Sequence, residues 1–330
     1  MSQDEVKKII DGAEGFVPSS MPPKLVACTL GDFLQTEFPP RENILAPWLQ
    51  TRSLNMIYSW RGVGKTHCAL GIAYAVASGG EFLGWKAEKP RGVLYIDGEM
   101  SASALKDRLM SINAGYVHNN IGENFRLVTP DQQTDAMPDL ATPDGQARID
   151  EIILPSTELI IIDNLSCLAR SGGRENDAES WNNISQWALA KRTQGISVLF
   201  IHHAGKNGNQ RGTSKREDIL DVVIILKHPE NYNPEDGAYF EVHFEKSRHI
   251  HGKDVNSFSA KLIQEEGKQN WSVTPLVESN KSRVIALHKE GLKPKEIASR
   301  LEIDPSTVHR NLDAAEKEGT IKPRPKRNKS

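Results

Sequence analysis

Short apolar runs alternate with amphipathic stretches from about residue 46 to residue 275. A short apolar run predicts a buried strand, whereas apolar residues at helical spacing predict a helix with one buried face. Their alternation is typical of a parallel sheet covered by helices on both faces, so we expect an α/β fold with a mostly parallel central sheet. The predicted strands are Leu54–Tyr58, Gly92–Ile96, Phe125–Val128, Leu159–Asp163, Ser197–His202, Val222–Leu226 and Tyr239–Phe244.

The segments outside these runs are predicted to be irregular. Prolines interrupt residues 1–45, where only Leu30–Leu34 has the pattern of a helical turn, so we expect an irregular N-terminal arm. Residues 167–180 and 204–216 are polar and predict two surface loops. Residues 267–280 have the composition of a linker.

A different pattern begins at residue 281 and predicts three short helices. The first carries apolar residues at Val284 and Leu287, and the second spans Pro294–Leu301. Asp304 followed by Pro305 is a typical start for the third, because Asp caps free backbone N–H groups and Pro suits the first turn.

The chain is therefore expected to contain three parts. They are the arm at 1–45, an α/β domain at 46–275, and a small all-α helix-turn-helix domain at 281–330. In the last of these, Glu318–Ile321 would start a wing and the final residues would form a basic tail.

Composition narrows the class of protein. With 38% hydrophobic and 25% charged residues, the chain can bury a sizeable core as a soluble protein. No apolar run reaches the ~18 residues that span a membrane, and the N-terminus lacks signal-peptide features. Cys28, Cys68 and Cys167 lack metal-ligand spacing, so each is expected to be a small buried hydrophobe in a reducing compartment. We expect a cytoplasmic protein without membrane contact.

Charge is unevenly distributed along the chain. The whole sequence has a formal charge of −2, but residues 281–330 contain 13 Lys or Arg and 7 Asp or Glu. A basic unit at one end of an acidic protein indicates a nucleic-acid contact there.

Ser59–Thr66 reads Ser-Trp-Arg-Gly-Val-Gly-Lys-Thr, between a predicted strand and the predicted helix His67–Ala77. This arrangement is typical of a loop that cradles phosphates, because its backbone N–H groups and the helix N-terminus favour an anion. Lys65 would reach the β- and γ-phosphates of ATP, and the Thr66 hydroxyl would ligate Mg²⁺. Ser59 replaces the usual first glycine, and an ordinary glycine-rich turn is the alternative. The predicted nucleotide-binding residues are Ser59, Arg61, Gly62, Val63, Gly64, Lys65, Thr66 and His67.

Two further carboxylates follow predicted strands. Asp163 ends an apolar run, where it could hold Mg²⁺ through water; a turn Asp after a core strand is the alternative. Glu99 follows the strand Gly92–Ile96 and precedes the predicted helix Ala102–Ser111, so it could act as the general base for the attacking water. Asp97 is equally near the strand end and competes for that role, while Glu99 could instead be a surface residue near the helix start.

Several other segments keep a characteristic order along the chain. They are Gly98–Ser101 with Leu105, Arg108 and Leu109; the pair His202-His203; Arg211; Asp221–Val223; and Glu245–Arg248. Over roughly residues 45–255 the chain resembles RecA-like hexameric helicases of the DnaB type. In size and in the histidine pair it is most similar to small plasmid-encoded RepA-type replicative helicases and their AAA-family relatives.

The resemblance implies roles that the pattern alone does not assign. Glu99 would activate water, and His202 or His203, with His203 preferred by position, would sense the γ-phosphate. Lys246 and Arg248 would act on a nucleotide bound by the neighbouring subunit of a ring. A structural or zinc-binding histidine pair and a solvated basic turn are the alternatives. The implied contacts with single-stranded DNA in the ring channel are Arg211 and Lys215, and an ordinary solvated loop is the alternative for these two residues.

The C-terminal helices resemble the helix-turn-helix of resolvases and many bacterial regulators. The N-terminal half of the third helix would then contact base edges and phosphates of duplex DNA. Its candidate residues are Ser306, Thr307, His309, Arg310 and Asn311. A helical bundle for protein docking is the alternative, and RepA-type helicases need not carry such a module.

These expectations combine into one leading hypothesis, an oligomeric ATPase, with a ring hexamer favoured, that works on DNA as a plasmid or phage replicative helicase. Two alternatives remain open. One is a DNA-binding regulator or partition-like protein that ATP switches, and the other is a recombination-mediator ATPase that does not unwind DNA.

Overall fold

The computed structural model describes residues 26–116, 121–170, 178–204, 218–230, 232–265, 267–276, 280–301, 303–317 and 319–321. The chain divides into two compact units, Met1–Pro40 and Arg41–Ser330. In the described part of the first unit, helix α2 (Leu30–Gln35) begins after Thr29, whose hydroxyl accepts a hydrogen bond from the Asp32 N–H. None of the residues of α2 is buried.

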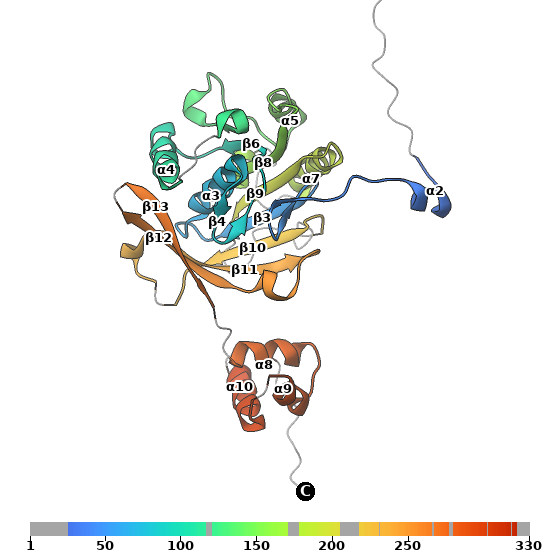
Figure 1. The fold of residues 1–330 in the computed structure, drawn as a ribbon, viewed down its shortest axis with the longest axis vertical. Helices are drawn as coiled ribbons and strands as arrows, with labels where there is room; N and C mark the ends of the chain where they lie inside the picture. Colours follow the sequence, from blue (N-terminus) through green and yellow to red (C-terminus); the bar gives the residue numbers. More distant parts are fainter. Residues whose placement is uncertain are drawn as a thin grey trace, which may run out of the picture. The chain divides into compact units, whose positions relative to one another are not determined.

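The second unit is built on a nine-stranded sheet with the order β13-β12-β11-β10-β3-β9-β8-β6-β7 (Figure 1). The strands from β10 to β7 in this order run parallel, whereas β11, β12 and β13 pair antiparallel at the other side. Their bounds are β3 (Leu54–Ser59), β6 (Gly92–Asp97), β7 (Phe125–Val128), β8 (Thr157–Asp163), β9 (Ser197–His203), β10 (Val222–Lys227), β11 (Tyr239–Ser247), β12 (Phe258–Glu265) and β13 (Lys268–Pro275).

Each face of the sheet carries its own hydrophobic core because successive side chains of a strand point to opposite faces. On β3, Ile57 packs in the core under α3 (Lys65–Ser78) and α4 (Ala102–Gly115). Its neighbours Met56 and Tyr58 pack in the core of the other face. That second core is covered by α5 (Pro143–Asp150), α6 (Leu165–Leu168) and α7 (Ala178–Thr193).

Smaller elements fill the connections. They are the hairpin strands β1 (Asn43–Leu45), β2 (Leu49–Gln50), β4 (Glu81–Phe82) and β5 (Trp85–Lys86), and the short 3-10 helices η1 (Gly122–Asn124), η2 (Pro130–Gln132), η4 (Pro234–Asp236) and η5 (Gly252–Val255). No helix in the described ranges is long and apolar enough to cross a membrane.

The α/β fold with a mostly parallel sheet is confirmed, and each predicted strand is present with its ends shifted by a few residues at most. The linker predicted at 267–280 is wrong, because residues 268–275 form β13. This strand and β12 pair from Phe258 with Pro275 to Glu265 with Lys268. Their many polar residues lie at the edge of the sheet, where exposed side chains are tolerated, and this composition hid the hairpin.

Three smaller predictions also need correction. The polar loop predicted at 167–180 is shorter, because α6 extends to Leu168 and α7 begins at Ala178. The irregular arm predicted at 1–45 ends earlier, since β1 begins at Asn43. Cys68 is buried as expected, but Cys167 is only partly buried, and Cys28 is exposed like the α2 residues that follow it.

The C-terminal residues form α8 (Asn280–Lys289), α9 (Pro294–Leu301) and α10 (Pro305–Lys317). These helices enclose a separate small core. Its buried members are Val284, Ile297, Ala298, Val308, Leu312, Ala315 and Ile321. Because Ile321 packs against the helices and residues 319–321 contain no strand, the wing predicted to start here is absent from the described residues.

Candidate functional site

The loop between β3 and α3 has the backbone that its glycines allow. Gly62 has φ 81° and Gly64 has φ 115°, a left-handed region that favours glycine. A Cβ atom at Gly64 would also lie 3.1 Å from the Phe240 ring. Gly64 is the N-cap of α3, so the chain turns from strand to helix and directs the helix N-terminus at the loop.

Lys65 is folded into this loop. Its Nζ donates hydrogen bonds to the Trp60 carbonyl at 3.0 Å and to the carbonyl and Oγ of Ser59, both at 3.3 Å. The side chain is 7% exposed. Ser59 therefore supplies a polar contact that the usual glycine could not make.

Asp163 and Thr66 place two side-chain oxygens, each a possible metal ligand, beside the loop. The Asp163 carboxylate accepts a hydrogen bond from the Tyr95 hydroxyl at 2.6 Å and another from the Thr66 side chain. Burial raises the pKa of Asp163 to about 6. A buried carboxylate next to a hydroxyl fits Mg²⁺, which prefers oxygen ligands and would favour the ionised acid.

Asp97 and Glu99 follow β6 but make different contacts. Asp97 is 1% exposed, and its Oδ1 accepts the backbone N–H groups of Glu99 and Met100 at 2.8 and 2.6 Å. Burial raises the pKa of Asp97 despite these hydrogen bonds. Its carboxylate therefore holds the turn after β6, whereas the Glu99 side chain is 60% exposed.

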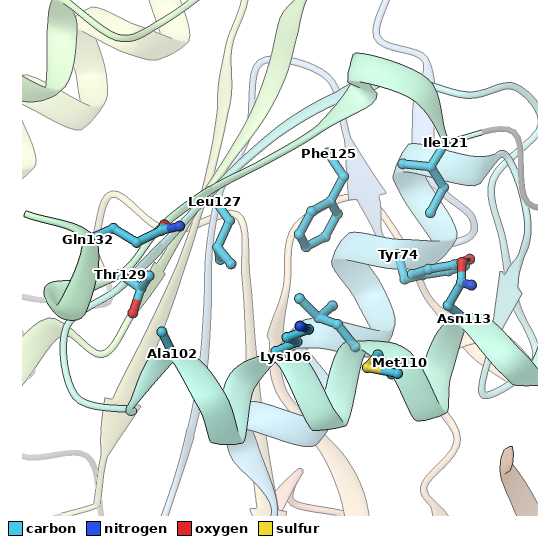
Figure 2. Close-up of a pocket in the computed structure, with 11 residues that line it drawn as sticks. Tyr74, Ala102, Lys106, Met110, Asn113, Ile121, Phe125, Leu127, Thr129 and Gln132 are labelled. Carbon is cyan, nitrogen blue, oxygen red and sulfur yellow. Dashed lines mark hydrogen bonds between the residues drawn. The ribbon is translucent and has the colours of Figure 1, made fainter. Parts of the chain in front are cut away.

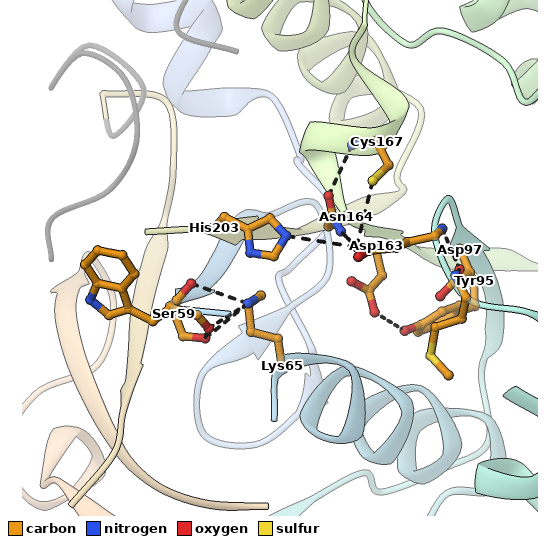
Figure 3. Close-up of polar contacts among 11 residues, drawn as sticks. Ser59, Lys65, Tyr95, Asp97, Asp163, Asn164, Cys167 and His203 are labelled. Atoms are coloured by element: carbon orange, nitrogen blue, oxygen red, sulfur yellow. Dashed lines mark hydrogen bonds and ion pairs between the residues drawn. The ribbon is translucent and has the colours of Figure 1, made fainter. Parts of the chain in front are cut away.

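The Glu99 carboxylate meets side chains from two other strand ends. Its Oε2 accepts a hydrogen bond from Asn164 Nδ2 at 2.5 Å and lies 3.8 Å from Cys167 Sγ. His203 Nε2, at the end of β9, lies 4.0 Å from the same oxygen. Figure 3 shows Asn164, Cys167 and His203 pointing toward one another near Asp163.

Most of these groups line a cavity of about 650 Å³, a size typical of a small-ligand site, although Tyr95 and Cys167 do not. Six of the eight predicted nucleotide-binding residues line it, while Ser59 and Val63 are buried behind the surface. Glu99, Asp163 and His203 line the cavity as well, but His202 does not. The lining residues include Arg61, Gly62, Gly64, Lys65, Thr66, His67, Asp97, Glu99, Asp163 and His203.

Other lining residues were missed as site residues. The sequence assigned no role to Asn164, which follows a predicted carboxylate, or to Arg108, which was named only within a segment of the family resemblance. Tyr232, Gly237 and Ala238 come from the connection between β10 and β11, whose sequence gives no sign that it folds back to the phosphate loop. Tyr232 stacks on His228 with 3.6 Å between ring centroids.

His67 lines this cavity close to the positively charged Arg108. Burial and the nearby positive charge of Arg108 lower the pKa of His67 to about 4. The imidazole is therefore neutral at pH 7.

Lys246 and Arg248 lie outside this cavity. Lys246 is on β11 and pairs with Val223 near the start of β10, at the edge of the sheet opposite the carboxyl ends of the parallel strands. The Arg248 guanidinium, just after β11, donates a hydrogen bond to the Asp218 carbonyl. Arg211 and Lys215 lie outside the described residues.

The predicted duplex-contacting residues lie on α10. Val308 and Leu312 are buried against the other helices. On the same helix, Ser306, His309 and Arg310 are exposed, and Thr307 and Asn311 are partly buried. Asp304 accepts a 2.7 Å hydrogen bond from the Ser306 N–H, as expected for the cap at the helix start.

Comparison with known families agrees with both parts of the chain. A family model described as an AAA domain matches residues 19–209, and one described as a homeodomain-like domain matches residues 275–323. The expected P-loop ATPase domain and C-terminal helix-turn-helix are thus confirmed. No curated protein matches the chain.

Solved structures that match the chain are distant in sequence. A KaiC-like protein from the archaeon Pyrococcus horikoshii OT3 is 14% identical, with 71% of this chain and 94% of that one covered and a TM-score of 0.48. A DnaB-like replicative helicase is 18% identical, with 66% and 57% covered and a TM-score of 0.45. The RadB recombinase is 15% identical, with 64% and 88% covered and a TM-score of 0.45.

Proposed function

We propose that this chain, which belongs to the AAA domain family, hydrolyses ATP with Mg²⁺ and couples hydrolysis to work on DNA as an oligomer. The observation that carries the proposal is that Lys65, Glu99 and Asp163 line the same cavity. A phosphate-binding ammonium, a candidate base and a metal-binding carboxylate together provide what γ-phosphate hydrolysis needs.

In this proposal the residues divide the chemistry among them. Lys65 and the loop N–H groups bind the β- and γ-phosphates, while Thr66 and Asp163 would hold Mg²⁺, Asp163 through water. The metal ion would neutralise charge on the phosphate oxygens. Glu99 accepts a proton as water attacks the γ-phosphorus, and the bond to the ADP oxygen breaks. His203 contacts the γ-phosphate from the end of β9.

We further propose that the oligomer is a ring, with a hexamer favoured. Lys246 and Arg248 would then contact the γ-phosphate bound by a neighbouring subunit, where a guanidinium stabilises charge in the transition state. Their position away from the cavity of their own subunit supports this assignment.

The proposed work is DNA unwinding by a replicative helicase of a plasmid, phage or similar mobile element. Single-stranded DNA would pass the loop that carries Arg211 and Lys215, and duplex DNA would bind α10. The homeodomain-like match at 275–323 supports the duplex contact.

A second candidate is a regulator whose DNA binding is switched by ATP, which the same helix-turn-helix match favours. Strand displacement separates the two. The full chain with ATP and Mg²⁺ is incubated with a labelled forked duplex, and Lys65→Ala serves as the control. Displacement by the wild type alone supports the helicase. ATP-dependent duplex binding without displacement favours the regulator, and hydrolysis stimulated by single strands without displacement favours a recombination mediator.

A further inference from the structure

The Asn164 carboxamide bridges two elements of the cavity. Asn164 is 3% exposed and lies between the end of β8 and the start of α6. Its Oδ1 accepts the Cys167 N–H at 3.1 Å, which makes Asn164 the N-cap of α6. Because the oxygen is committed to the helix, the amide nitrogen is the end directed at Glu99.

The contacts of Glu99 are asymmetric. Asn164 Nδ2, Cys167 Sγ and His203 Nε2 all approach Oε2. Within the described residues, no hydrogen bond or ion pair involves Oε1. The Asn164 hydrogen bond, at 2.5 Å, is the shortest of these approaches.

A mostly exposed glutamate needs such a hydrogen bond if its carboxylate is to stay in one position as a general base. Its side chain has several rotatable bonds, and fixing a side chain of this kind in one conformation costs rotamer entropy. Asn164 is itself fixed by burial and by its cap hydrogen bond, so it can hold the carboxylate in a defined place.

We propose that Asn164 is a positioning residue that binds one oxygen of Glu99, so that the other oxygen accepts the proton of the attacking water. The inference rests on the proposed hydrolysis of ATP. A neutral amide suits the task because it restrains the carboxylate without giving it a proton. Capping α6 does not explain the amide, since Asp or Ser would cap equally well.

The test uses this difference between capping and positioning. Asn164→Asp keeps an acceptor for the Cys167 N–H but places a second carboxylate against Glu99. Asn164→Ser keeps the cap with a side chain too short to reach Glu99. We expect kcat for ATP hydrolysis by the full chain to fall ~10–100-fold in both. KM for ATP, nucleotide affinity and the melting temperature should stay close to the wild-type values.

Two controls make the result specific to Glu99. In a Glu99→Gln background, Asn164→Ser should lower kcat little further, because the two residues act as a unit. Asn183→Ser makes the same change at a residue of α7 that donates to the Ala141 carbonyl outside the cavity, and should leave kcat unchanged.

Each other outcome overturns the proposal. Wild-type kcat in both Asn164 variants would show that the amide does not position the base, and a raised kcat would show that it restrains the base from reacting. If kcat, nucleotide affinity and melting temperature all fell together in both Asn164 variants, Asn164 would have a structural role alone. If the wild type does not hydrolyse ATP, or if Glu99→Gln is fully active, the proposed function fails first and the positioning role falls with it.

Discussion

Ser59 and Ser247 lie at opposite ends of three adjacent strands. Ser247 pairs with Val222, and Val222 pairs with Asn55, four residues before Ser59. At about 3.3 Å per residue, this separates the two serines by about 13 Å along the strands. The phosphate loop begins at Ser59, whereas Lys246 and Arg248 flank Ser247. The basic pair is therefore held away from the cavity of its own subunit.

In the proposed oligomer, this separation predicts that two subunits share each active site. Arg248→Ala and Glu99→Gln proteins should each hydrolyse ATP slowly, but a mixture should recover part of the activity. Recovery occurs because some interfaces would pair an intact Glu99 with an intact Arg248. ATPase rates across mixing ratios, at a concentration where the oligomer forms, provide the measurement.

The matching control mixes each variant with itself at the same total concentration, where no recovery is expected. Hydrolysis by the wild type should also rise more steeply than linearly as monomers assemble. Rates that stay proportional to concentration, in a range shown to contain both monomer and oligomer, would rule out a shared site.

A second prediction separates binding from chemistry inside the cavity. Lys65→Ala removes the ammonium that is folded into the phosphate loop, so nucleotide binding should be lost. Glu99→Gln keeps the shape of the side chain but removes the base, so binding should persist while kcat falls by ~10²–10⁴-fold. Equilibrium binding of a fluorescent ATP analogue and steady-state hydrolysis measure the two effects. Full turnover in Glu99→Gln would transfer the base role to another group.

The sequence predicted the centre of this molecule better than its edges. The central strands are short, apolar and buried on both faces, so the pattern of Leu159–Asp163 predicts a core strand with a carboxylate at its end. Most residues of β13 are exposed, and its many polar side chains gave residues 267–280 the composition of a linker. Burial on one face gives a weaker signal than burial on two.

The same contrast holds for the cavity. Glycines and a Lys-Thr pair at fixed spacing identify the phosphate loop, because the loop is continuous in sequence. Asn164 and Tyr232 reach the cavity only through the order of the strands. A partner such as Asn164 for Glu99, 65 residues away, depends on β6 and β8 pairing in register. That pairing is not encoded locally.

A third prediction concerns His67 and the stability of the nucleotide-free protein. The pKa of His67 is lowered from 6.5 to about 4 in the folded chain. Above pH 6.5 both the folded and unfolded states hold a neutral imidazole, so its contribution to stability is complete. As pH falls below 6.5 the unfolded chain takes up the proton first, and stability is lost until pH passes about 4.

His67→Gln should remove this part of the pH dependence. Between pH 7.5 and 5, the wild type should lose roughly 1–3 kcal/mol more free energy of unfolding than the variant. Urea unfolding at several pH values measures the difference. Curves that run parallel for the two proteins would show that His67 titrates alike in the folded and unfolded states.

A fourth prediction concerns the exposed face of α10. If Arg310 contacts a base edge in the major groove, Arg310→Ala in the full chain should weaken binding to the preferred duplex by ~1–3 kcal/mol. Binding to unrelated duplexes should change less, because those complexes depend on phosphate contacts and fall steeply with salt. Fluorescence anisotropy with a selected and a scrambled duplex, at several salt concentrations, measures both effects.

Arg283→Ala is the matched control, since it removes the same charge from an exposed position on α8. This variant should change the binding affinity for the selected and the scrambled duplex by the same factor. Arg310 lies two residues after the buried Val308 and is exposed on the face of α10 that is proposed to enter the major groove. Equal losses on both duplexes from Arg310→Ala would identify a phosphate contact, and unchanged binding would show that α10 is not the recognition helix.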